Sequence, residues 1–154
     1  MNYPEYQKDL QRIHESEVYG TAVFDMAARL ARNPARKQKW LALKALEEQT
    51  LQRYLDYMKE TGQPVTEPRG WALKGMAEGA ALGLMPWWLA MRLLRDGTQP
   101  FQEKFLRLKD HAEGGDKAFF AYVYAHEKAI EAFAQKELAR DAGSLKAVHS
   151  LLGR

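Results

Sequence analysis

The sequence contains no cysteine, and this absence excludes a whole group of sites. Without thiols there can be no disulfide framework, no thiolate metal site and no cysteine nucleophile. Any metal would therefore have to be bound by carboxylate and imidazole side chains, which suit iron. The missing thiols leave the redox compartment undetermined, because disulfide-free chains occur in every compartment.

Long apolar runs and an excess of one charge are also missing. The first twelve residues, MNYPEYQKDLQR, contain no continuous apolar stretch, so we expect no signal peptide and a cytoplasmic location. The formal net charge is only +3, and the basic residues are interleaved with acids, so we expect no nucleic-acid partner. Hydrophobic residues make up 46% of the chain, which is typical of one folded domain spanning residues 1–154.

The apolar residues recur every three or four positions, and no segment alternates like a half-buried strand. The sequence therefore predicts an all-α fold with breaks at Asn33-Pro34, Gly62 and Gly114-Gly115. Long helices joined by a very short connection form antiparallel hairpins, so we expect an up-down four-helix bundle with a short extra helix. The expected helices span about residues 5–32, 35–61, 71–95 (bent at Pro86), 101–112 and 116–142, with a turn at 96–100 and a short tail after Gly143.

Two glutamates fall on helix faces that are otherwise apolar. Glu17, in the stretch RIHESEV (12–18), occupies a missing step in the apolar seam of the first helix, and Glu47 lies near the middle of the apolar face of the second. Both are at similar distances from the turn at 33–34, so they should be roughly level in one interior. A buried carboxylate is costly unless a metal, a charge or hydrogen bonds compensate it. The residues alone leave three explanations open: a metal site, an ion pair with Lys44 or Arg53, and a position at the edge of the bundle.

Several stretches carry a resemblance to one family. RIHESEV resembles the first-helix signature of the demethoxyubiquinone hydroxylases, which belong to the ferritin-like superfamily, and it places Glu17 on an iron-ligand position. EEQTLQRYLDYMKETG (47–62) resembles the second helix of that family and of bacterial ferritins, with Glu47 on a ligand position and Thr50 where a ligand histidine stands. WALKGMAEGAALG (71–83) resembles the run that follows in the hydroxylases, and YAHEKAIEAF (124–133) resembles the third-helix ligand motif of both relatives.

The resemblance implies a ferritin-like bundle with a two-iron centre. Adjacent helical residues point about 100° apart, so His126 and Glu127 are not expected to bind one ion without distortion. The histidines of the two Glu-x-x-His motifs found in such centres are missing, so a full two-iron ligand set is not visible. The metal ligands implied by the resemblance are Glu17, Glu47 and Glu127, with His14, His126 or Glu131 completing the set.

The activity implied by the resemblance is that of a divergent di-iron oxidase or hydroxylase. Such a protein brings dioxygen or peroxide to ferrous iron and oxidises a lipophilic, quinone-like substrate at a membrane surface. The alternative is a metal-free bundle that binds a protein partner or lipid through the glycine- and tryptophan-rich helix 71–95. The two functions differ in whether the inward glutamates still hold a metal.

Helix 71–95 is the expected contact surface in both cases. Its Gly75, Gly79 and Gly83 recur every four residues and form a smooth face for close helix contact, in the core or between two chains, and we expect the protein to be a homodimer. Trp87 and Trp88, followed by arginines, suit a segment that lies at the surface of the inner membrane. The helix is too short and too interrupted to span a bilayer.

Overall fold

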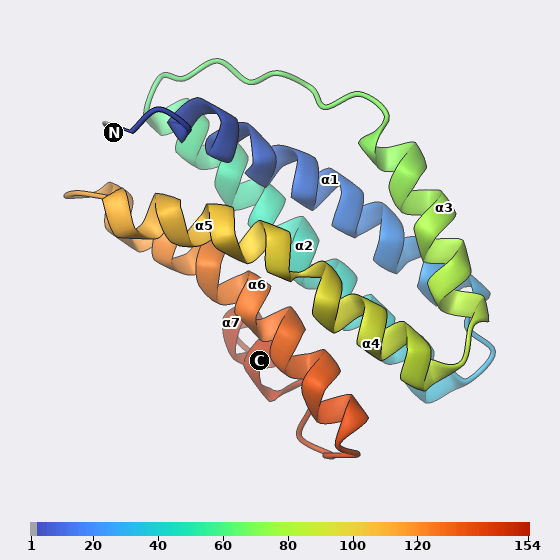
Figure 1. Cartoon of the computed structure of the whole chain (residues 1–154). Coiled ribbons are helices and arrows are strands. Elements are labelled where there is room, and N and C mark those ends of the chain that lie inside the picture. The colour runs from blue at the N-terminus through green and yellow to red at the C-terminus, as the bar shows by residue number, and fades with distance from the viewer. Residues whose placement is uncertain (1–2) are drawn as a thin grey trace.

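The computed structural model describes residues 3–154, and within this range every regular element is a helix (Figure 1). The predicted all-α fold is thus confirmed. None of the described helices combines the length and apolar character needed to cross a membrane. The helices are α1 (Tyr6–Leu30), α2 (Pro34–Glu60), α3 (Trp71–Leu84), α4 (Trp87–Gly97), α5 (Gln99–His111), α6 (Asp116–Leu138) and α7 (Lys146–Leu152).

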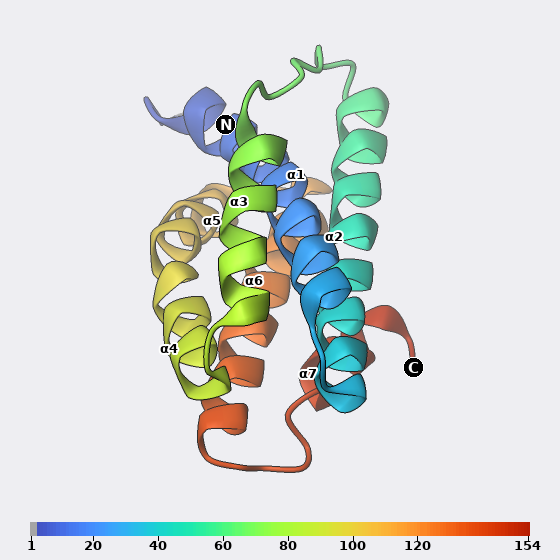
Figure 2. The ribbon, with the colours of Figure 1, turned by 90° about the vertical axis from the view of Figure 1, so that its right-hand side faces the viewer.

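Two antiparallel hairpins form the bundle, and α3 lies outside it. The first hairpin is α1 with α2, and the second joins α6 to α4 and α5, which follow one another in the same general direction (Figures 1 and 2). Between the hairpins the segment 61–70 passes along the first half of α1, where the Gln11 amide donates to the Thr66 carbonyl at 3.1 Å, and α3 then runs along the outside of α1 (Figures 1 and 2). Because of this crossover, α2 and the α4–α5 pair run in the same direction.

The turn between α1 and α2 forms as the sequence predicts. The Asn33 side chain accepts a hydrogen bond from the Arg36 backbone N–H at 3.1 Å and so caps α2. Pro34 occupies the first helical position, where its missing N–H costs nothing. A short connection with these two residues therefore reverses the chain and brings α1 and α2 side by side.

The predicted helix 71–95 is instead two helices. Met85 has an extended backbone (φ −83°, ψ 166°), because a residue before proline is disfavoured in the helical conformation. The chain therefore turns sharply at Pro86 rather than bending within one helix. As a result, the second half of this segment (α4) joins the bundle, whereas the first half (α3) remains outside it. The predicted turn at 96–100 is also shorter: only Thr98 lies between α4 and α5.

The C-terminal end of the chain also differs from the prediction. The last long helix ends at Leu138 rather than near residue 142, because Arg140 adopts a left-handed conformation (φ 57°). The Asp141 backbone N–H then bonds to the Lys136 carbonyl at 2.9 Å, which closes the helix in the way a glycine usually does. The predicted tail contains the short helix α7, which packs on α2 and α6.

Glycines let α3 approach α1 closely. A Cβ added at Gly75 would lie 2.4 Å from the Tyr19 carbonyl oxygen, and one added at Gly79 would lie 2.3 Å from the Val23 carbonyl oxygen. Neither position has room for a side chain. The close helix contact predicted from the glycine spacing is thus confirmed, and it is made within the chain.

The core consists of two apolar clusters with a polar layer between them. Phe24, Trp40 and Phe133 belong to one cluster, while Tyr54 and Phe105 belong to the other. On α1, α2 and α6 the residues that separate the clusters along each helix include buried acids and a buried histidine. The fold thus places titratable groups in the middle of the bundle, far from the helix ends.

Candidate metal centre

Three buried side chains from three helices meet in this polar layer. The Oε1 atom of Glu17 on α1 lies 3.0 Å from Nε2 of His126 on α6, and Oε2 of Glu47 on α2 lies 3.4 Å from the same nitrogen. One ligand atom from each residue lies within 4.8 Å of the other two. All three residues are at most 3% exposed. The predicted meeting of Glu17 and Glu47 is therefore observed, and His126 is the third member of the group.

Glu127 lies next to this group. Its Oε2 atom is 3.6 Å from His126 Nε2, and the residue is 4% exposed. His126 and Glu127 therefore both face the interior, although Glu127 is not among the three residues whose ligand atoms all lie within 4.8 Å of one another. The reason is that α6 is covered by α2 on one side and by α4 and α5 on another, so two neighbouring directions both lead inward.

The ring of His126 has a defined orientation. Its Nδ1 atom lies within hydrogen-bond distance of the Val123 carbonyl oxygen, one turn back along α6. A carbonyl can only accept, so Nδ1 carries the proton in this bond, and Nε2 faces the carboxylates, where it becomes available to a metal once its own proton is lost. This is the arrangement in which a histidine binds a metal.

Several polar atoms of the group are buried without a hydrogen bond. Both carboxylate oxygens of Glu17, Oε2 of Glu47, Oε2 of Glu127 and Nε2 of His126 have no hydrogen-bond partner. Buried polar atoms in proteins are nearly always satisfied, so unpaired oxygens and a nitrogen in one place call for a missing partner. A cation at the centre of the group would satisfy all of them at once.

No lysine or arginine pairs with these acids in the part of the chain that is described, and His126 is the basic group beside them. In residues 3–154, no lysine or arginine nitrogen lies within 4.0 Å of the carboxylates of Glu17, Glu47 or Glu127. Lys44 pairs instead with Asp25 at 3.1 Å and Arg53 lies over the Tyr122 ring at 4.1 Å. The ion pair considered from the sequence is therefore excluded for these acids.

The surroundings change the proton affinity of the group. Burial, reinforced by the neighbouring Glu17, raises the pKa of Glu47 well above its usual value, and burial raises the pKa of Glu127 to about 8. Burial alone would lower the pKa of His126, but the adjacent Glu17 and Glu47 carboxylates outweigh it and raise that pKa. Without a cation, the group therefore retains protons at neutral pH.

Gly20 provides the space into which Glu47 extends. A Cβ at this position would lie 2.7 Å from Glu47 Oε1 and 2.8 Å from its Cδ. Gly20 follows Glu17 by one helical turn on the same face, so a side chain there would separate the two acids. The sequence pattern places this glycine in the apolar seam but does not reveal its role.

Thr50 does not supply a ligand, in agreement with the departure noted in the sequence. Its hydroxyl donates to the Leu46 carbonyl at 2.9 Å and lies 2.8 Å from the Tyr122 hydroxyl. The Tyr122 ring in turn stacks on His126, with centroids 6.2 Å apart and planes 17° apart. Thr50 thus holds the Tyr122 hydroxyl, and the Tyr122 ring packs against His126 on the same helix. The sequence pattern does not reveal this contact.

Two other predicted ligands are not brought to the group. His14 is buried against the Tyr54 ring, 5.1 Å between centroids, and its Nε2 lies 3.9 Å from the Glu67 carboxylate. Glu131 accepts a hydrogen bond from Lys128 at 2.8 Å and another from Gln99. Their partners thus draw both side chains away from the centre.

Helix α5 contributes no buried acid to the group. On α5 the buried polar residue is Gln102, whose amide donates to the Thr98 hydroxyl at 2.9 Å. A two-iron bundle takes a carboxylate from each of four helices and a histidine from two of them. The described residues bring together three acids and one imidazole, which fit a single ion.

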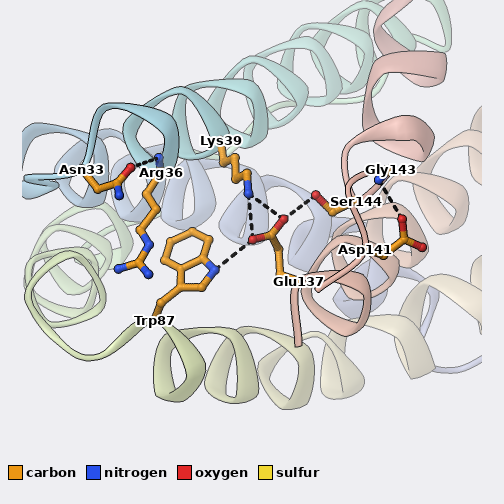
Figure 3. Close-up of polar contacts among 8 residues, drawn as sticks. All are labelled: Asn33, Arg36, Lys39, Trp87, Glu137, Asp141, Gly143 and Ser144. Atoms are coloured by element: carbon orange, nitrogen blue, oxygen red, sulfur yellow. Dashed lines mark hydrogen bonds and ion pairs between the residues drawn. The ribbon is translucent and has the colours of Figure 1, made fainter. Parts of the chain in front are cut away.

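The tryptophan pair at the start of α4 is divided between interior and surface. Trp87 Nε1 donates to the Glu137 carboxylate at 2.9 Å, and this carboxylate also accepts from Lys39 at 2.8 Å and from the Ser144 hydroxyl (Figure 3). Trp88, by contrast, is 57% exposed. Of the two residues expected at a membrane surface, Trp87 is therefore engaged within the chain and Trp88 faces solvent.

Comparison of the chain with known protein families, curated proteins and solved structures identifies no relative. The resemblance to the hydroxylases and ferritins rests on four short stretches, within residues 12–18, 47–62, 71–83 and 124–133. Any functional conclusion therefore depends on the geometry of the buried group.

Proposed function

We propose that this chain is a divergent ferritin-like metal protein that binds one transition-metal ion, preferentially iron, at Glu17, Glu47 and His126. The observation that carries the proposal is the convergence of buried oxygen and nitrogen atoms without hydrogen-bond partners from three helices, with no described lysine or arginine beside them. Ionised carboxylates in such a place are very costly unless a cation compensates them. Oxygen and imidazole donors suit iron and neighbouring metals.

The connectivity supports the ferritin-like part of the proposal. Ferritin-like bundles consist of two antiparallel hairpins joined by one long crossover. In this chain the segment 61–70 and α3 together make such a crossover between α2 and α4. The fold and the sequence resemblance therefore point in the same direction.

The donor set favours one ion over two. Glu17, Glu47 and His126 surround a common point, and Glu127 is close enough to His126 to act as a fourth ligand. A second ion would have to share these four residues, because α5 offers an amide rather than a carboxylate at Gln102. We therefore propose a mononuclear remnant of the two-iron centre that the resemblance implies.

Bound ferrous iron would supply electrons to dioxygen or peroxide and so oxidise an organic substrate, for which the resemblance suggests a lipophilic, quinone-like molecule. The residues of the chain prepare the site for this chemistry. The Val123 carbonyl fixes the proton of His126 on Nδ1, and the apolar clusters on either side exclude water. Glu127, with its raised pKa, can hold a proton on Oε2 beside the reacting molecule.

Metal titration of matched variants tests the proposal. Purified protein is stripped with a chelator and titrated anaerobically with iron(II), and the metal content of cells grown in iron-supplemented medium is measured alongside. Wild-type protein should bind about one ion per chain, and Glu47→Gln should bind at least about tenfold more weakly because a ligand is lost. Glu48→Gln is the control, because Glu48 is adjacent but exposed and paired with Lys44. Equal metal binding by wild type and a folded Glu47→Gln variant would refute the site.

Exposed apolar residues on α3 and α4 favour a second candidate, lipid binding by a metal-free bundle. Leu84 is 64% exposed, Trp88 57% and Leu93 48%, and the last two lie on α4 beside Arg92. Sedimentation with vesicles containing anionic lipid measures this directly. The Trp88→Ala variant should lose binding, whereas Leu106→Ala, on α5, should not. Equal sedimentation of wild type and Trp88→Ala would count against the contact.

A further inference from the structure

A cavity of about 290 Å³ leads from the surface to the proposed metal centre. It lies between α1 and α6, with α3 and α4 forming its outer wall. The exposed residues Glu78, Leu93 and Gly97 line it at the surface, and the buried Glu47 and Glu127 line it at the inner end. Both inner acids are less than 5% exposed and each has one oxygen without a hydrogen-bond partner.

The volume limits the size of a ligand. A protein cavity of roughly 150 Å³ is known to hold a benzene molecule. The present cavity is nearly twice as large, so it accommodates about a dozen non-hydrogen atoms, the size of a two-ring aromatic compound. A long isoprenoid chain would not fit inside and would have to extend through the opening.

The walls of the cavity are mostly apolar and favour a ligand with an apolar ring system. Phe24 and Ile130 line the deep part of the cavity, and Leu82, Met85 and Leu94 contribute further apolar surface nearer the opening. Burial of an apolar ligand against such walls contributes in proportion to the area removed from water.

The charged residues that line the cavity favour a cationic ligand. The charged residues among those that line the cavity are Glu47, Glu78 and Glu127, all acidic, and no described lysine, arginine or histidine lines it. Glu78 lies beside the Tyr19 hydroxyl, and Lys74 lies over the ring of the same tyrosine at 5.6 Å rather than in an ion pair with Glu78. Lys74, the basic residue one turn before Glu78, lies over the Trp71 ring at 5.0 Å. At the opening, the Glu78 carboxylate therefore favours a cationic ligand over an anionic one.

We propose that this cavity binds a small, mainly apolar amine, with its apolar body against Phe24 and Ile130 and its ammonium group at Glu78. This assignment replaces the quinone-like substrate that the resemblance suggests with an amine as the substrate class of the proposed metal protein. It rests on the proposed function only for the chemistry, because binding itself needs no metal. The inner acids then place a bound ion next to the apolar end of the ligand.

Three probes of matched shape test the charge preference. Naphthylmethylamine, naphthylmethanol and naphthoate have the same ring system and differ in the charge of one substituent. Their affinities for the wild-type protein are measured by calorimetry, with and without metal. The amine should bind at least about tenfold more tightly than the carboxylate, since the two charges differ in sign beside Glu78. The Glu78→Gln variant should reduce the preference for the amine over the alcohol several-fold.

A filling substitution tests the location. Ala81 lines the cavity from α3 and is itself exposed, so Ala81→Trp closes the opening with little effect on the core. Ala77, one turn earlier on α3, is exposed and does not line the cavity, so Ala77→Trp is the matched control. Circular dichroism confirms that both variants are folded. We expect Ala81→Trp to abolish amine binding and Ala77→Trp to retain it.

Two results would overturn the proposal: equal affinity for the amine and the carboxylate, or equal binding by the two tryptophan variants. The metal titration provides an independent readout. Amine binding to chelator-treated protein together with failed metal binding would remove the proposed function and leave the cavity assignment intact. Metal binding without amine binding would remove the cavity assignment and leave the proposed function intact.

Discussion

At the scale of single residues, the proposed centre depends on Gly20, because the lack of a side chain there leaves room for the Glu47 carboxylate. Glu47 crosses to Glu17 and His126 through the space above Gly20, where any Cβ would overlap its carboxylate. Contacts shorter than 3 Å between carbon and a carboxylate are relieved by movement of the more flexible group, here the end of the glutamate. Gly20 therefore determines where the Glu47 carboxylate can lie, although Gly20 itself has no side chain at the proposed centre.

We predict that Gly20→Ala weakens metal binding while leaving the fold intact. The added methyl group displaces the Glu47 carboxylate, and changes to groups that orient a ligand typically cost about 10–100-fold in metal affinity. Alanine favours the helix, so the loss in folding stability should be small. Iron(II) titration measures the affinity. The control is Gly97→Ala, whose Cβ would meet no atom within 4 Å. An unchanged affinity in Gly20→Ala would show that Glu47 is not held at this site.

The sequence could identify the acids of the centre but not their geometry. Glu17 and Glu47 are recognisable because a charge interrupts an apolar period, and this signal depends only on helix geometry. The inward direction of the His126 ring depends on its contact with Val123 and on the helices that surround α6, and neither is encoded locally. For the same reason His14, one turn from Glu17, looked like a ligand although it packs against Tyr54.

At the scale of the helices, Glu137 connects elements that are far apart in the sequence. It lies on α6, and its carboxylate accepts hydrogen bonds from Lys39 on α2, from Trp87 on α4 and from Ser144 before α7 (Figure 3). The side chain is only 8% exposed. One carboxylate thus joins both hairpins and the C-terminal segment at this end of the bundle.

We predict that Glu137→Gln destabilises the protein at neutral pH, and less so in acid. Burial alone would raise the pKa of Glu137, but the hydrogen bonds from Lys39, Ser144 and Trp87 outweigh it and lower this pKa. A group whose pKa is lower in the folded state contributes stability above its unfolded pKa and loses it as the pH falls through the folded value. The variant should therefore lose about 1–3 kcal/mol of unfolding free energy at pH 7.

Urea unfolding at neutral and at strongly acidic pH, in the presence of a chelator, measures both effects. The difference between wild type and Glu137→Gln should shrink as the wild-type carboxylate becomes protonated. Glu60→Gln serves as the control because Glu60 is exposed at the end of α2. A difference that is the same at both pH values would contradict the role of the charge.

The helix boundaries show which signals act locally. Asn33 and Pro34 predict the turn between α1 and α2 because both act within one turn of the chain. The break before Pro86 is sharper than predicted, since proline only disfavours a helical residue before it and packing decides the outcome. The end of α6 could not be predicted, because Arg140 adopts the left-handed conformation that normally marks glycine.

At the scale of the whole molecule, the break at Pro86 changes which segments form the bundle. The sequence predicts the bundle and its first hairpin, but it treats 71–95 as one of the four bundle helices. In the structure α3 covers α1 from outside, and the α4–α5 pair takes the fourth place. This exchange places Phe105 of α5 against the His126 ring, 6.0 Å between centroids, and the buried residues of α5 include no acid. The number of acids at the proposed centre therefore depends on tertiary packing, which no local sequence pattern encodes.

The proposed ion would connect both hairpins, since Glu17 and Glu47 belong to the first and His126 to the second. We therefore predict that metal raises the Tm of the whole domain. A ligand at a hundred times its Kd stabilises the folded state by about 2.7 kcal/mol. For a chain of this length, that corresponds to a rise of roughly 5–10 °C.

Scanning calorimetry with and without iron(II) under anaerobic conditions measures this rise, with Glu17→Gln as the ligand variant and Glu48→Gln as the exposed control. The rise should be larger at pH 8 than at pH 6, because metal must displace the proton that the raised pKa of Glu127 retains. An equal rise in wild type and Glu17→Gln would mean that the ion binds elsewhere. A rise that is lost when either Glu17 or His126 is replaced would mean that one ion at this layer couples the two hairpins, because Glu17 lies on α1 of the first hairpin and His126 on α6 of the second.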